Sequence, residues 1–128
     1  AMSTMRSPLG RARGLGSAKS GLAPFLALRL TAIALVPLVL WFVTAVIRLM
    51  GADHDTLREF LGAPGNAAAF VLLILAAFHH AQLGLQEVVV DYVHGRAAQT
   101  ALLLGIRFFA ALAAIFLVLS VIKLGFGV

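Results

Sequence analysis

Three long apolar runs limit what this chain can fold into, because each is long enough to cross a bilayer as an α-helix. They cover about residues 28–50, 67–93 and 98–124. A helix over the first run extends about 34 Å at 1.5 Å per residue, enough to span the hydrocarbon with some tilt. The sequence therefore predicts an all-α membrane protein with three transmembrane helices running up, down and up.

Composition supports this class and excludes several kinds of site. Hydrophobic residues make up 62% of the 128 and charged residues only 12%, which is typical of membrane proteins. Cysteine is absent, so this chain cannot supply disulfides, thiolate zinc sites, iron–sulfur ligands or a covalent haem attachment. Any metal would have to be held by one of four histidines. The net charge of +5 does not indicate nucleic acid, because the basic residues cluster before the first apolar run.

The chain divides into a basic tail, residues 1–23, and a transmembrane domain, residues 24–128. The tail is rich in Gly, Ser, Ala and Arg. It is either a disordered tail or a segment that orders against anionic lipid or an acidic partner. Between the first two apolar runs, Thr56–Glu59 matches a capping box and predicts one short helix at the membrane surface. That helix would have Leu57, Phe60 and Leu61 on one face.

The distribution of basic residues predicts the orientation. The side with the N-terminus and the loop after the second run holds six Lys or Arg, and the opposite side holds three. Because cytoplasmic loops carry more Lys and Arg, we expect the N-terminus inside and the C-terminus outside. The six are Arg6, Arg11, Arg13, Lys19, Arg29 and Arg96, and the three are Arg48, Arg58 and Lys123.

A polar stripe interrupts the second run, where ionisable side chains are costly and by default indicate function. His80, Gly84, Glu87 and Asp91 stand at i, i+4, i+7 and i+11, on one face of a helix that turns about 100° per residue. Small residues extend this stripe towards the N-terminus, namely Ala76 and Ala77.

His80 has three possible uses: a haem ligand, a hydrogen bond between helices, or a proton relay. Small residues one turn away could provide the slot that a porphyrin needs, but three helices do not enclose a haem, so a partner chain would be required. His79 points about 100° away and is expected to make an interhelical hydrogen bond. The two remaining histidines, His54 and His94, are expected to be solvated loop residues.

Two further residues have alternative interpretations. Arg107 in the third run would reach the depth of Gly84, so it could pair with Glu87 or extend alone to the interface. Tyr92 follows Asp91 at a membrane edge. It could belong to an interfacial aromatic belt or donate a hydrogen bond to a quinone carbonyl.

The sequence resembles a known family, the smaller hydrophobic membrane anchors of bacterial succinate dehydrogenase (respiratory complex II). The second-helix signature is His80-Ala81-x-x-Gly84 followed by Asp91-Tyr92-Val93. Two other segments resemble the family's N-terminal pattern, Pro8–Arg11 and Arg29–Ile33. The tail over residues 14–19 is most similar to alphaproteobacterial members.

The resemblance implies an enzyme subunit that itself does no succinate chemistry. The chain would form half of a haem-binding bundle with a second membrane anchor in the bacterial inner membrane. His80 would be one axial ligand of haem b, and the second anchor would supply the other histidine. Tyr92 would bind ubiquinone with Asp91 in support, and Arg29 would lie near the haem propionates or the quinone pocket. The chain would dock the iron–sulfur subunit and the flavoprotein, which carry the clusters and the flavin.

A different function class remains open from the residues alone. A small helical transporter or channel subunit would also place ionisable side chains inside the bundle, here His80, Glu87 and Arg107. No inverted repeat is visible in the sequence, and an odd number of spans prevents simple internal duplication. A structural subunit without a cofactor is a third possibility.

Overall fold

The computed structural model describes residues 18–127, and within that range it contains four α-helices and no strand. They are α2 (Ala18–Leu49), α3 (His54–Gly62), α4 (Pro64–Tyr92) and α5 (Arg96–Phe126). Helices α2, α4 and α5 are long and apolar enough to cross a membrane. The predicted all-α fold with three spans is therefore confirmed. The basic tail before residue 18 lies outside the described residues.

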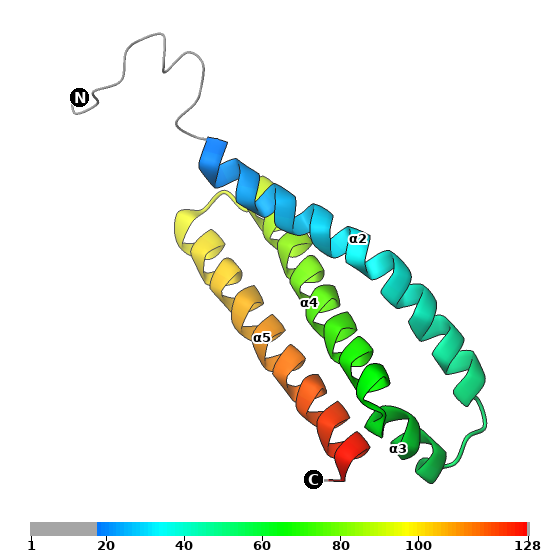
Figure 1. The fold of residues 1–128 in the computed structure, drawn as a ribbon. Helices are drawn as coiled ribbons and strands as arrows, with labels where there is room; N and C mark the ends of the chain where they lie inside the picture. Colours follow the sequence, from blue (N-terminus) through cyan, green and yellow to red (C-terminus); the bar gives the residue numbers. More distant parts are fainter. Residues whose placement is uncertain (1–17, 128) are drawn as a thin grey trace, which may run out of the picture.

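The helices form a layer with α4 in the middle (Figure 1). Helices α2 and α5 each pack on α4, and α3 packs on α5 and α4 at the end where the chain finishes. The predicted antiparallel pairing of the second and third spans is thus present. All three long helices begin before the predicted apolar runs, and α2 does so by the most residues, at Ala18. At their C-terminal ends α2 and α4 stop one residue short of the prediction, and α5 extends two residues beyond it.

Local chemistry explains where the helices end. Pro64 starts α4, a position where its missing N–H has no intrahelical partner to lose. Gly127 ends α5 with φ +68°, in the left-handed region that glycine adopts without a Cβ penalty. Pro37 lies inside α2, and the helix continues through it to Leu49.

The short surface helix exists, but its cap differs from the prediction. Asp53, and not Thr56, is the N-cap of α3, because the Asp53 carboxylate accepts a hydrogen bond of 2.9 Å from the Thr56 N–H. The predicted capping box therefore begins three residues too late. The predicted apolar face is confirmed, since Leu61 is 5% exposed and Leu57 and Phe60 are half-buried.

Asp53 gives α3 a pH dependence that can be measured. The hydrogen bonds from Thr56 lower the pKa of the Asp53 carboxyl, so the cap stabilises α3 above the unfolded pKa and is lost as the pH falls through the folded value. We expect Asp53→Ala to accelerate hydrogen exchange at the first-turn amides near neutral pH. The difference from wild type should begin to shrink near pH 4, the ordinary carboxyl pKa, and should vanish only below the lowered pKa of Asp53 in the folded chain.

The control for the cap is Asp55→Ala, which removes another first-turn carboxylate that makes no capping bond. Equal exchange in Asp53→Ala and Asp55→Ala would mean that helix-dipole charge, and not the cap, stabilises this end of α3.

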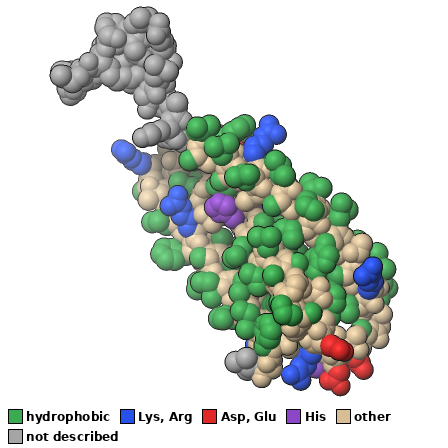
Figure 2. Space-filling model, in the orientation of Figure 1, with side chains coloured by type: hydrophobic (Ala, Val, Ile, Leu, Met, Phe, Trp, Pro, Cys, Tyr) green, Lys and Arg blue, Asp and Glu red, His purple; other side chains and the backbone are tan. Residues whose placement is uncertain are grey.

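Small side chains make up most of the buried residues between the helices. Five of the seven buried apolar residues are alanines, which allow membrane helices to approach closely. No polar or charged side chain among the described residues is buried. Hydrophobic side chains cover most of the face seen in Figure 2, and the acidic ones gather at the α3 end. The buried alanines are Ala45, Ala67, Ala76, Ala110 and Ala114.

Aromatic rings join α2, α3 and α4 at this same end. Trp41 stacks on Phe60 with ring centroids 6.2 Å apart, and it meets Phe70 edge-on at 5.1 Å. Phe42 also meets Phe70 edge-on, at 5.8 Å. Trp41 is therefore packed against neighbouring helices.

The backbones of α3 and α5 meet at two glycines. A Cβ on Gly125 would lie 2.5 Å from the Leu61 carbonyl oxygen, and one on Gly62 would lie 2.5 Å from the Gly125 oxygen. Because these neighbours are backbone atoms, they cannot rotate away. We expect Gly125→Ala to displace α3 and lower the stability of the folded chain by about 1–3 kcal/mol, as for other overpacked sites.

Thermal unfolding in detergent checks this, with Gly105→Ala as the matched control on the same helix. A Cβ at Gly105 would meet nothing within 4 Å. The control should be neutral or slightly stabilising, because alanine favours helix. If both variants unfold at the same temperature, the close approach of α3 and α5 does not contribute to stability.

Candidate functional site

The polar stripe of α4 faces α2. Thr31 of α2 contacts His80 of α4. Pro24, seven residues before Thr31, lies across a pocket from Glu87, which is seven residues after His80. This register is that of two antiparallel helices in contact along their length. His80 and Glu87 thus lie on one side of α4, as the helical spacing predicted.

The opposite side of α4 meets α5. There a groove is lined by four residues of α4 and three of α5, almost all apolar. These two faces of α4 are about half a turn apart. The lining residues are Phe78, Ala81, Gln82, Leu85, Ile106, Phe109 and Ala110.

Of the two possibilities for Arg107, this arrangement excludes the pair with Glu87. No ion pair joins the two side chains within 4 Å; Glu87 lines a pocket on the α2 side, and Arg107 is exposed on α5. The depth of Arg107 was inferred correctly, since its neighbour Ile106 lies beside Leu85. The pair does not form because Glu87 points away from α5, towards the pocket on the α2 side.

His80 is half-buried and bonded through one ring nitrogen. Its Nδ1 lies 3.0 Å from the Thr31 hydroxyl oxygen. No hydrogen bond to Nε2 occurs within residues 18–127. Beside His80, a Cβ added to Gly84 would meet nothing within 4 Å, so the stripe is open one turn further along α4. His80 therefore has one nitrogen engaged by protein and space next to its ring.

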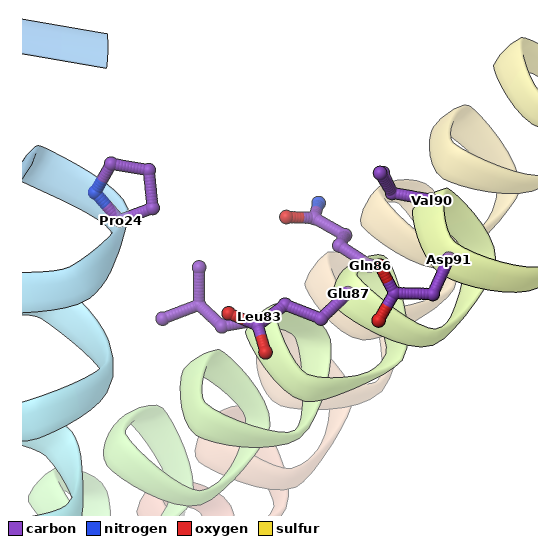
Figure 3. A pocket seen from close by; sticks show the side chains of 6 residues that line it. All are labelled: Pro24, Leu83, Gln86, Glu87, Val90 and Asp91. Atoms are coloured by element: carbon purple, nitrogen blue, oxygen red, sulfur yellow. The ribbon is translucent and has the colours of Figure 1, made fainter. Parts of the chain in front are cut away.

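A polar pocket of about 380 Å³ lies at the N-terminal end of α2 and the C-terminal end of α4. Figure 3 shows Pro24 of α2 across from Leu83 and Glu87 of α4, with Gln86 and Asp91 nearby. Gln86 is half-buried as a residue, and its inaccessible Nε2 atom has no hydrogen-bond partner within residues 18–127. The pocket thus combines two carboxylates with an unpaired amide donor.

The other predicted site residues lie near this end. Tyr92 is the last residue of α4 and is 77% exposed; Asp91, beside it, lines the polar pocket. Arg29 is exposed on α2, with its guanidinium carbon 5.3 Å from the centre of the Phe25 ring. The structure brings Asp91 together with Glu87 but leaves the Tyr92 ring outside the pocket.

The remaining histidines differ from His80. His79 is exposed and lines a shallow groove with Thr31 and residues of α2 and α4, and no hydrogen bond to it occurs within residues 18–127. The interhelical hydrogen bond predicted for His79 is therefore made by His80. His54 and His94 are exposed, as expected, but His54 is the first residue of α3 and only His94 lies in a loop.

Sequence reasoning did not assign Thr31, Gln86 or Pro24 to the site. Thr31 stands in the quoted Arg29–Ile33 segment, but nothing in the sequence alone says which residue of the second span it meets. A hydroxyl in an apolar run, at the depth of an intramembrane histidine on an antiparallel neighbour, is the signal that could have identified it.

Comparisons with known proteins match almost the whole chain. The family model described as "Succinate dehydrogenase/Fumarate reductase transmembrane subunit" matches residues 3–121. A succinate dehydrogenase hydrophobic membrane anchor subunit of Rickettsia bellii is 28% identical over 120 residues, covering 94% of this chain and 96% of the relative. That of Paracoccus denitrificans is 29% identical over 122 residues, covering 94% and 93%. No solved structure matches.

Proposed function

This chain belongs to the succinate dehydrogenase/fumarate reductase transmembrane subunit family, and from that premise we propose that it is the hydrophobic membrane anchor of a bacterial succinate dehydrogenase. In this role it contributes one axial ligand to haem b, forms part of the ubiquinone-reduction site, and docks the iron–sulfur and flavoprotein subunits. The observation that carries the proposal is the His80 imidazole, held by Thr31 at Nδ1 and free of protein partners at Nε2 among the described residues.

The donor set fits haem better than a bare metal ion. No three His, Cys, Asp or Glu side chains gather to hold a metal within the described residues. A porphyrin brings four nitrogen ligands of its own, so it needs only one imidazole from this chain and one from a partner. His80 would bind the iron through Nε2, with the open position at Gly84 leaving room beside the ring. When bound, the haem would supply one-electron transfer.

A partner membrane subunit is needed to complete this site. Helices α2 and α5 pack on α4 but leave long apolar surfaces uncovered, and many of their large hydrophobic side chains are exposed. Lipid can cover part of that surface, and a second membrane anchor would cover the side that holds His80. Arg29 is exposed on α2, and its cation would meet a haem propionate or the quinone pocket.

The end of α4 provides the groups for quinone reduction. Tyr92 is exposed and makes no hydrogen bond within residues 18–127, so its phenol is available to donate to a ubiquinone carbonyl. Asp91 and Glu87 line the adjacent pocket and can hold or pass the protons that the reduced quinone takes up. The predicted orientation places this end at the cytoplasmic side of the inner membrane, where the iron–sulfur subunit would dock.

Purification of the complex through a tag on this chain tests this function. We expect flavoprotein, iron–sulfur subunit and a second anchor to copurify, with succinate:ubiquinone reductase activity and a b-type haem band in the reduced-minus-oxidised spectrum. A colourless preparation without these partners would instead favour the transporter alternative.

A further inference from the structure

We propose that Thr31 is a positioning residue for haem b: its hydroxyl accepts a hydrogen bond from His80 Nδ1–H and thereby sets the tautomer and donor strength of the ligand. This inference rests on the proposed ligation by His80. It assigns to α2 a residue that tunes the haem without touching the iron.

The Thr31 hydroxyl has three partners within reach. Its Oγ1 lies 2.8 Å from the Ala27 carbonyl oxygen, 3.0 Å from the Leu28 carbonyl oxygen and 3.0 Å from His80 Nδ1. A hydroxyl has one proton to give and two lone pairs with which to accept. A carbonyl oxygen can only accept, so the proton goes to the helix backbone, as threonine hydroxyls in helices commonly bond to the preceding turn.

The direction of the His80 bond follows from this. With its proton on the Ala27 and Leu28 carbonyls, the Thr31 oxygen can only accept from Nδ1. His80 Nδ1 therefore carries the proton, and in the neutral ring Nε2 keeps its lone pair. That tautomer is the one that can bind iron at Nε2. A hydrogen bond donated by the second nitrogen also fixes the ring orientation and makes the ligating nitrogen more basic.

Burial makes the bond effective. Both Thr31 and His80 are half-buried where α2 and α4 pack, within helices long and apolar enough to cross a membrane. Removing the hydroxyl should therefore weaken electron donation from His80 to the iron. Because a basic ligand favours ferric over ferrous haem, its weakening should raise the midpoint potential.

The test compares Thr31→Val, Thr31→Ser and the matched control Thr44→Val in the purified complex. Thr44 lies on the same helix, and within residues 18–127 its hydroxyl bonds to the Trp41 carbonyl and to no histidine. We expect Thr31→Val to raise the ratio of reduced to oxidised haem at a fixed potential by about three- to tenfold, a tenfold change being about 59 mV for one electron. Thr31→Ser, which keeps the hydroxyl, and Thr44→Val should stay at the wild-type potential.

Different outcomes separate this inference from the function it rests on. An unchanged or lowered potential in Thr31→Val, with haem still lost in His80→Ala, overturns only the role of Thr31. A wild-type complex without haem, or haem retained in His80→Ala, overturns both. If Thr31→Val assembles without haem, recovery of haem and potential in Thr31→Ser supports the inference, and failure of Thr31→Ser to recover them contradicts it.

Discussion

Replacing His80 with alanine is expected to abolish the b-type haem band of the purified complex while the subunits still assemble. The imidazole is the only intramembrane side chain of the described residues with a nitrogen both oriented by a second helix and free to bind iron. Loss of an axial ligand should cost more than the tenfold to hundredfold in affinity that is typical when an outer-shell partner is removed. Haem content relative to flavin, measured by visible absorption, checks this.

The matched control is His79→Ala. His79 is the neighbouring residue on the same helix, is exposed, and makes no hydrogen bond within the described residues. This variant should keep its haem, because the His79 ring lies about 100° around the helix from His80. The reverse result, with haem lost in His79→Ala and kept in His80→Ala, would move the ligand by one residue and remove the role inferred for Thr31.

Replacing Tyr92 with phenylalanine is expected to lower quinone reduction strongly while sparing succinate oxidation. The variant keeps the ring and loses only the hydroxyl that would donate to the quinone carbonyl. Removing one preorganised donor to a developing oxyanion typically costs about a hundredfold or more in rate. Succinate:ubiquinone reductase activity should fall accordingly, whereas succinate oxidation by a soluble artificial acceptor, which takes electrons before the membrane site, should be unchanged.

The control for Tyr92 is His94→Gln, which changes an exposed loop residue two positions further along that lies outside the polar pocket. Both activities of this variant should match wild type. Equal loss of quinone-linked and artificial-acceptor activity in Tyr92→Phe would indicate poor docking of the iron–sulfur subunit, and the proposed contact between Tyr92 and quinone would then be wrong.

Features that depend on local chemistry could be predicted from the sequence. Apolar run length predicted three spans because a bilayer requires a helix of about 20 residues. The spacing of His80, Gly84, Glu87 and Asp91 predicted one face of one helix, because an α-helix has a fixed angular step. Their signature with Tyr92 indicated the family. The cap of α3 was missed because Asp53 and Thr56 both begin plausible capping patterns, and only the backbone geometry separates them.

The partner of that polar face was decided by tertiary structure. Helical periodicity places Glu87 on the same face of α4 as His80, and antiparallel pairing of α4 and α5 places Arg107 at the membrane depth of Gly84. Neither argument says that α4 lies between α2 and α5. Packing puts α2 on the His80 side and α5 on the opposite side. This packing therefore joins Thr31 to His80 and separates Arg107 from Glu87. Contacts between helices depend on the direction each residue faces around its helix axis and on the order in which the helices pack, and local sequence patterns do not encode the second of these.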